Sequence, residues 1–223
     1  MQVLLLRHGR TSGNERKRYI GVTDESLSEL GRKDCEKLCS LLSLSDIWQP
    51  DRKIRVVVSP MKRCQETAEI LFSIKRAPEQ EVLNGSYSVK SGKVEVITDR
   101  ELRECNFGIF ENKNYLELQQ EPLYQQWIDS NGTMDFPKGD CLKAWKERSV
   151  QAFIRQAKQA LEQQIELLVL VIHGGNIMSI MECLEEQRLG YYDYQIANGA
   201  GYLTEVKDES ITLSKTRVIS PQR

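Results

Sequence analysis

The stretch Val3-Leu4-Leu5-Leu6-Arg7-His8-Gly9 decides the fold class, because an apolar run is followed at once by a guanidinium, an imidazole and a glycine. The run predicts a buried strand, and the glycine lets the backbone turn sharply behind it. The second histidine of the chain stands in the same setting, since Leu167–Ile172 is followed by His173-Gly174-Gly175. Both histidines therefore lie at the carboxyl end of an expected strand, which is where open α/β sheets bind ligands.

Short apolar runs alternate with helical patterns along the rest of the chain. Ile54–Val58 and Val94–Ile97 are two further expected strands, and Gly201–Val206 and Ile211–Ile219 are expected to close the sheet. Helical periodicity covers Leu27–Leu44, Met61–Phe72, Leu142–Gln164 and Asn176–Leu184. Continuously apolar strands are covered on both faces and are typically parallel. The pattern predicts a three-layer α/β/α domain with a mostly parallel central sheet.

Two stretches interrupt this alternation. Arg76–Gly92 contains Pro78, Asn84, Gly85, Ser86 and Gly92, which predicts a loop. Cys105–Cys141 is polar with isolated aromatic residues and is too long for a simple connection, so we expect a cap or lid beside a site. We see no linker or repeat and therefore expect one domain over residues 1–223.

The composition limits the binding partners and the cellular compartment that we expect for this chain. The chain has 223 residues with 40% hydrophobic and 28% charged residues and a net charge of −1, which gives no reason to expect nucleic acid or an anionic membrane. No apolar stretch is long enough to span a bilayer, and the apolar start is too short for a signal peptide. The 6 cysteines form no C-x-x-C pair, so we expect no zinc site and reduced thiols in a cytoplasmic protein.

Two strand ends supply groups that suit a phosphate. The run from Arg7 to Asn14 offers cationic, hydroxyl, amide and backbone donors within one turn region. Ser59-Pro60-Met61-Lys62-Arg63 is another strand end that leads into a helix, where Arg63 adds a planar fork. The alternative is that Lys62 and Arg63 are solvated surface charges.

A proton donor completes the expected chemistry. Glu104 follows the strand near Val94–Ile97 and is therefore expected at the same sheet edge as His8, Arg63 and His173, although a single Glu is usually a surface charge. A neutral imidazole can act as a nucleophile, guanidinium groups can stabilise the phosphoryl oxygens, and a carboxylic acid can protonate the leaving alkoxide. We find neither a P-loop nor an obvious acidic metal cluster in the sequence, and we expect a reaction without metal or other cofactor.

Five separated blocks resemble the histidine phosphatase superfamily, in the branch that contains the cofactor-dependent phosphoglycerate mutases. They are LLLRHGRTSGN (4–14), GVTDESLSELGR (21–32), SPMKRCQETAEIL (59–71), LRECNFGIFE (102–111) and VIHGGNIM (171–178). The resemblance implies a phosphoglycerate mutase-like fold and a phosphohistidine intermediate. It makes His8 the nucleophile and Glu104 the proton donor. The implied phosphate pocket consists of Arg7, Asn14, Gly21, Arg63, His173 and Gly174.

Departures from the mutase pattern favour a phosphatase. Mutases of this type usually carry Tyr before the Gly, a Lys further on, and paired Arg residues in the cap that grip the substrate carboxylate. Here Phe107 precedes Gly108, Tyr115 stands in place of the Lys, and no Arg-Arg pair occurs in the cap. NFGIFEN (106–112) with IANGA (196–200) is most similar to the α-ribazole-5′-phosphate phosphatases of cobalamin assembly. A mutase and a phosphate-binding protein without turnover are the alternatives.

The expected cap suggests the kind of leaving group. Cys105–Cys141 presents Tyr115, Tyr124 and Trp127 but only two lysines, Lys113 and Lys138. Aromatic faces suit a ring-bearing leaving group, whereas a carboxylate such as that of phosphoglycerate requires a cationic fork. The alternative is that these aromatic residues simply pack the cap onto the domain. The expected partner is a small phosphomonoester, and a homodimer is left open.

Overall fold

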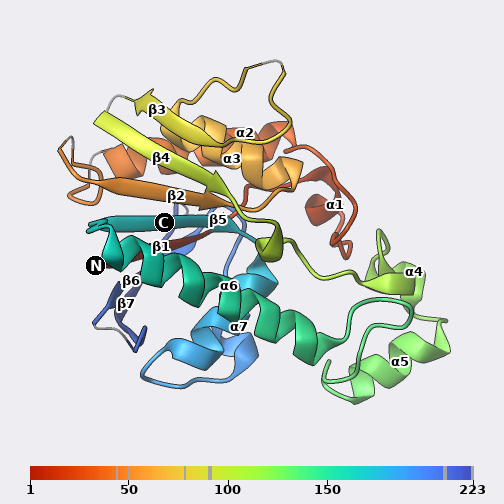
Figure 1. Ribbon diagram of the computed structural model, residues 1–223. Helices are drawn as coiled ribbons and strands as arrows, with labels where there is room; N and C mark the ends of the chain where they lie inside the picture. The colour runs from red at the N-terminus through yellow and green to blue at the C-terminus, as the bar shows by residue number, and fades with distance from the viewer. Residues whose placement is uncertain (44, 50, 78, 90–91, 208–209, 222–223) are drawn as a thin grey trace.

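A sheet in the order β3-β4-β2-β5-β1-β6-β7 runs through the computed structural model (Figure 1). The structure describes residues 1–223 except 44, 50, 78, 90–91, 208–209 and 222–223. The strands are β1 (Gln2–Arg7), β2 (Ile54–Val58), β3 (Gly85–Val89), β4 (Gly92–Thr98), β5 (Leu167–Ile172), β6 (Gly201–Val206) and β7 (Leu213–Ile219). The predicted α/β class is confirmed.

The central strands β4, β2, β5 and β1 are parallel, whereas β3, β6 and β7 are added antiparallel at the two sides. The parallel part is thus confined to the middle of the sheet. Its register aligns Arg7 of β1 with Ile172 of β5, and Val58 of β2 with Val171 of β5. The residues that follow these strands consequently meet at one edge.

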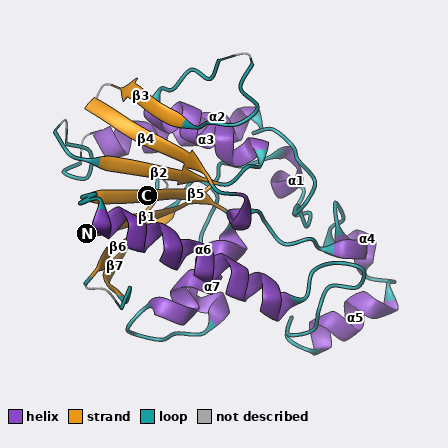
Figure 2. Cartoon of the chain, in the orientation of Figure 1, coloured by secondary structure: helices purple, strands orange, loops and turns teal. Residues whose placement is uncertain are grey.

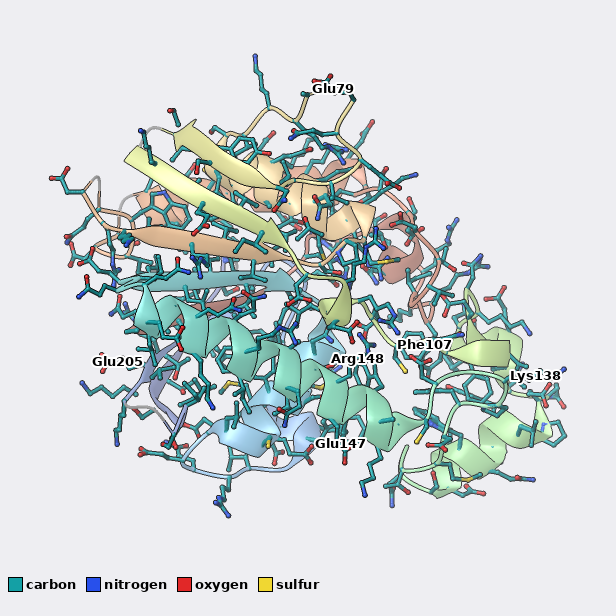
Figure 3. The ribbon with its side chains drawn as sticks, viewed as in Figure 1. Glu79, Phe107, Lys138, Glu147, Arg148 and Glu205 are labelled. Atoms are coloured by element: carbon teal, nitrogen blue, oxygen red, sulfur yellow. The ribbon has the colours of Figure 1, made fainter. Side chains whose placement is uncertain are left out.

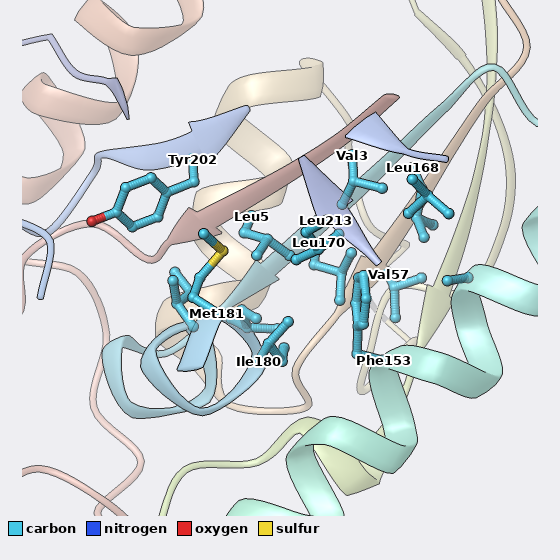
Figure 4. Close-up of a cluster of buried hydrophobic side chains, with 14 of the residues drawn as sticks. Val3, Leu5, Val57, Phe153, Leu168, Leu170, Ile180, Met181, Tyr202 and Leu213 are labelled. Carbon is cyan, nitrogen blue, oxygen red and sulfur yellow. The ribbon is translucent and has the colours of Figure 1, made fainter. Parts of the chain in front are cut away.

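Helices cover both faces of the sheet, as Figure 2 shows. They are α2 (Glu29–Ser43) and α3 (Lys62–Phe72) on one face, and α6 (Leu142–Glu162) and α7 (Gly174–Leu184) on the other. Leu38 and Phe72 pack with the strand residues of the first face. Phe153 and Ile180 pack with Leu5 and its neighbours on the second face (Figure 4). The strands are buried from both sides, which explains their continuous apolar runs. The predicted end of the first helix, residue 44, lies outside the described residues.

The loop prediction for Arg76–Gly92 is wrong at its end. Gly85–Val89 forms β3, an edge strand that pairs antiparallel with β4. Tyr87 and Val89 are half-buried while Gly85, Ser86 and Ser88 are exposed. A strand of this kind has no apolar run, because one face and one edge meet solvent.

The segment 105–141, which we call the cap, lies beside the carboxyl ends of the parallel strands (Figure 1). It contains η2 (Gly108–Phe110), α4 (Tyr115–Leu118) and α5 (Pro122–Asp129). Its own apolar cluster consists of Cys105, Phe110, Leu118, Tyr124 and Phe136, together with Trp145 of α6. Short helices α1 (Ser12–Glu15), η1 (Arg100–Leu102) and η3 (Tyr191–Tyr194) lie in connecting segments. Among the described residues, no helix combines the length and apolarity required to cross a membrane.

Candidate active site

The two histidines lie next to each other at the ends of β1 and β5. The register that pairs Arg7 with Ile172 places His8 beside His173, and the His8 amide donates to the carbonyl of Ile172 at 3.0 Å. The ring centroids are 5.2 Å apart and the ring planes meet at 67°. Parallel pairing of β1 with β5 therefore brings the two strand ends, and both histidines, together.

The hydrogen bond of His8 fixes its tautomer. Nδ1 lies 2.7 Å from the carbonyl oxygen of Gly9, and because a carbonyl only accepts, Nδ1 must carry the proton. Burial lowers the pKa of His8 well below 6.5, and the positive charges of Arg63 and Arg7 lower it further. The imidazole is therefore neutral near pH 7, with a lone pair on Nε2.

His173 is also buried and neutral. Its Nε2 and the hydroxyl of Ser59, at the end of β2, form a 2.8 Å hydrogen bond. Burial lowers the pKa of His173 well below 6.5, and the neighbouring Arg63, His8 and Arg7 lower that pKa further. Ser59 thereby orients the second imidazole, a contact that sequence reasoning missed even though the residue stands at a predicted strand end.

Two arginines bring positive charge to the histidine pair. Arg7 donates from Nη1 to the carbonyl of Ile196 at 2.7 Å, and Arg63 is 0% exposed with its terminal nitrogens bonded to backbone carbonyls. Within the part of the chain that the structure describes, the buried Nε atoms of both arginines have no hydrogen-bond partner. Unpaired buried donors of this kind require an acceptor, and a phosphate oxygen provides one.

Asn14 and Gly174 line the same cavity as Arg7 and His8. The Oδ1 atom of Asn14 accepts from the amide of Thr11 and from Asn198, both at 3.2 Å, so its own amide hydrogens remain for a ligand. A Cβ at Gly174 would lie 3.2 Å from the Arg7 guanidinium, which explains the glycine at the start of α7. The N-terminus of α7 favours an anion here.

Gly21 has a different environment from the one its expected role requires. Its amide donates to the Glu111 carboxylate at 2.7 Å, and its carbonyl accepts from Arg63 at 2.9 Å. Gly21 is absent from the described lining of the cavity, as are the side chains of Arg63 and His173. The structure thus places Gly21 against Arg63 and Glu111, while Arg7, Asn14 and Gly174 line the cavity together with His8.

Glu104 lies in the segment after β4, whose backbone is fixed by hydrogen bonds from α6. Arg148 of α6 donates to the carbonyls of Glu101 and Arg103, and this fixes the backbone just before Glu104 (Figure 3). The carboxylate accepts from the amide of Cys105 at 2.9 Å and lines the cavity. Burial raises the pKa of Glu104, against opposing contributions from that amide and nearby arginines. A buried carboxyl with a raised pKa is suited to donate a proton.

A cavity of about 880 Å³ continues from His8 toward the cap. Its wall includes Phe107, which is labelled in Figure 3, and also Trp127, Phe136, Trp145, Tyr191 and Tyr192. The expectation that Tyr115 and Tyr124 also face the substrate is wrong. Tyr115 is 57% exposed away from the cavity, and Tyr124 is buried in the cap, where it stacks on Trp127.

The cavity wall contains positively charged side chains from outside the cap. From the sequence, we considered only the two lysines within the cap and therefore did not predict them. Arg18 pairs with Glu117 at 2.7 Å, Lys146 pairs with Glu182 at 2.8 Å, and Lys143 lies 3.9 Å from Glu147. Lys146 also lies 3.7 Å from the centre of the Tyr191 ring. The charges in this part of the wall are therefore mutually compensated. No cluster of three or more metal-binding side chains occurs within the described residues.

A histidine at the end of each of two adjacent parallel strands, with guanidinium groups around them, forms a pocket suited to a phosphate. The model of the histidine phosphatase superfamily (branch 1) matches residues 3–84 and 86–218. The chain belongs to this superfamily, as the five sequence blocks predicted.

Three relatives show the range within this family. Phosphoglycerate mutase-like protein 4 of Arabidopsis thaliana is 31% identical over 185 residues, which cover 81% of this chain and 70% of that protein. A metal-independent phosphoserine phosphatase of the same plant is 25% identical over 182 residues, covering 80% and 66%. The solved α-ribazole phosphatase of Shigella flexneri has a TM-score of 0.69 at 23% identity, with 96% of this chain and 95% of that chain covered. This last likeness establishes the phosphoglycerate mutase-like fold.

Proposed function

We propose that the protein is a phosphatase that hydrolyses a small phosphomonoester through a phosphohistidine on His8. One observation carries this proposal: the bond from Nδ1 of His8 to the Gly9 carbonyl leaves a neutral Nε2 as the nucleophile beside a cavity. The unpartnered Nε donors of Arg7 and Arg63 supply the complementary charge for a phosphate. A binding protein would not require the buried acid Glu104.

In the first step, Nε2 of His8 attacks phosphorus while the bond to the ester oxygen breaks. The Glu104 carboxyl gives its proton to the departing alkoxide, so that a neutral alcohol leaves. In the second step, water attacks the phosphohistidine and Glu104 takes a proton from it. The P–N bond breaks, phosphate departs, and both side chains return to their starting states.

The positive charge for both steps comes from side chains. Arg7 and Arg63 lie around His8, and His173 adds a neutral donor group fixed by Ser59. Guanidinium groups placed before the reaction stabilise the phosphoryl oxygens where charge spreads in a loose transition state. We therefore propose that turnover needs no metal ion.

The end of the cavity that lies toward the cap favours a leaving alcohol that bears a ring and has no net charge. Trp127, Phe107 and Tyr191 provide aromatic surface, and the cations there are paired with carboxylates. A substrate carboxylate would have to displace one of these partners, which disfavours phosphoglycerate. We propose α-ribazole 5′-phosphate as the substrate to test first, because its leaving group is a large heteroaromatic nucleoside. The similarity to the Shigella fold is consistent with this choice.

A phosphate-release assay with a small substrate panel tests the proposal. The panel contains α-ribazole 5′-phosphate, O-phosphoserine and 3-phosphoglycerate, each with and without a chelator after dialysis. We expect hydrolysis unaffected by the chelator and the highest kcat/KM for the ring-bearing ester. A loss of activity that Mg²⁺ restores would overturn metal independence, and interconversion of 2- and 3-phosphoglycerate would identify a mutase. Binding of every phosphate without release would identify a binding protein.

A further inference from the structure

The carboxylate of Glu111, in the cap, accepts three backbone amides. Oε1 accepts from Gly21 at 2.7 Å and from Thr23 at 2.9 Å, and Oε2 accepts from Phe107 at 3.3 Å. Two of these amides belong to the loop 20–23, and the third belongs to the cavity wall. One side chain therefore joins that loop to the cap.

The opposite side of the loop 20–23 holds Arg63. Its Nη1 donates to the carbonyl of Thr23 at 2.9 Å, and its Nη2 donates to Gly21 at 2.9 Å and to Ile20 at 3.4 Å. These bonds occupy both terminal nitrogens and leave Nε as the donor without a partner in the described structure. The loop thus determines which nitrogen of Arg63 remains without a protein partner.

A single peptide unit connects the two charged groups. The peptide between Ile20 and Gly21 donates through its N–H to Glu111 and accepts through its carbonyl from Arg63. Hydrogen bonds in such a chain polarise one another, so the carboxylate strengthens the acceptor that the guanidinium uses. The loop also has little room to shift, because a Cβ at Gly21 would lie 1.9 Å from the carbonyl oxygen of Cys105.

We infer that Glu111 is a positioning residue for Arg63, and that it sets the phosphate affinity of the site by holding the loop 20–23 against the cap. The inference deepens the proposed function and rests on it for the role of Arg63 in phosphate binding. It also means that the cap, which forms part of the leaving-group wall, is mechanically connected to the phosphate end through one carboxylate.

Orthovanadate titration of the full chain tests this role, with Glu111→Ala, Glu111→Gln and the control Asp129→Ala. Asp129 is a cap carboxylate too, but it is exposed, accepts from Gln125 and is not part of the cavity lining. We expect Glu111→Ala to weaken vanadate binding about tenfold, the scale of one charge-assisted hydrogen bond. Glu111→Gln keeps one acceptor oxygen and should stay within about threefold, and Asp129→Ala within about twofold.

The dissociation constant separates positioning from a general loss of stability. A poorly folding variant lowers the number of binding sites without changing the affinity of those that remain. The amides of Gly21 and Thr23 should also exchange faster with solvent in Glu111→Ala than in Asp129→Ala. Unchanged vanadate affinity in Glu111→Ala would overturn the inference. If the Ala variant does not fold, Glu111→Asp decides the question, because its shorter side chain withdraws the carboxylate from the three amides, and unchanged affinity in that variant would likewise overturn the inference. If the wild type binds vanadate but hydrolyses no ester, the proposed function is wrong. The vanadate affinities of the variants would still test the role of Glu111.

Discussion

The two ends of the cavity are built in different ways. The phosphate end consists of His8, His173, Arg7 and Arg63, which lie at strand ends or in the first turn after one, and hydrogen bonds within the sheet fix their places. The leaving-group end is assembled from the cap, α6 and η3, which are connected by loops. In the proposed reaction, the chemistry therefore depends on the sheet, whereas the choice of substrate depends on what packs against it.

Charge distinguishes the same two ends. At the phosphate end, Arg7 and Arg63 donate to backbone carbonyls, and neither forms an ion pair with a carboxylate among the described residues. At the leaving-group end, Arg18 and Lys146 each have a carboxylate partner. The phosphate end is therefore complementary to an anion and the other end to an uncharged group. Substitutions of His8, His173, Arg7 or Arg63 should affect every substrate equally, and substitutions at the second end should affect substrates unequally.

Removal of the nucleophile is expected to have the largest effect. His8→Ala should lower kcat/KM by at least ~10³-fold for every phosphomonoester, because no group replaces Nε2. Labelled substrate quenched under conditions that preserve phosphohistidine should leave an acid-labile phosphoryl group on the wild type and none on the variant. Most of the activity surviving in His8→Ala would show that another residue is the nucleophile.

Removal of the proton donor is expected to depend on the leaving group. Glu104→Gln should lower kcat by about 10²–10³-fold for alkyl phosphates and far less for p-nitrophenyl phosphate, whose phenolate leaves without a proton. Burial raises the pKa of Glu104, so the acid form persists above the usual carboxyl range. Wild-type activity should fall as the pH rises through that raised pKa, and the variant should lack this limb. An equal loss on both esters would exclude general acid catalysis by Glu104.

Much of the phosphate end could be predicted because it follows from local signals. A strand, a histidine and a glycine occur twice, and parallel pairing of β1 with β5 then forces His8 beside His173. Glu104 lies where the end of β4 suggested, since the turn after that strand is short. Periodicity and strand ends are encoded by residues that are close in the sequence. A single sequence was therefore sufficient to predict this end of the cavity.

The leaving-group end could not be predicted from the same signals. Trp127 and Tyr124 are three residues apart on α5, yet one lines the cavity and the other is buried, because the face that α5 presents depends on tertiary packing. Tyr191 and Lys146 come from distant segments and meet only in the folded chain. The edge strand β3 was missed for a related reason, since its polar sequence reflects its position at the sheet edge.

Burial of a neutral histidine predicts a pH-dependent stability. The pKa of His8 is well below 6.5 in the folded protein, so the unfolded chain binds a proton first as the pH falls. Stability should therefore decrease below the unfolded pKa, by at most about 2 kcal/mol per histidine near pH 5. Denaturant unfolding of wild type and His8→Asn at pH 7 and 5 measures this, and the variant should lose less. Parallel losses in the two proteins would show that His8 does not contribute.

The smallest effect is expected at the leaving-group end, where Trp127→Ala removes an aromatic wall. The ring-bearing ester should lose about tenfold in kcat/KM, on the scale of lost aromatic contact, while a minimal phosphomonoester stays nearly unchanged. Tyr115→Ala is the matched control, because Tyr115 belongs to the same cap but is 57% exposed and does not line the cavity. It should leave both esters unaffected. Equal losses on both substrates in Trp127→Ala would mean that the indole supports the phosphate end through the packing of the cap, and the division between the two ends would then fail. A loss confined to the ring-bearing ester would place substrate choice in the cap, because His8, Arg7 and Glu104 are the same for every phosphate that enters.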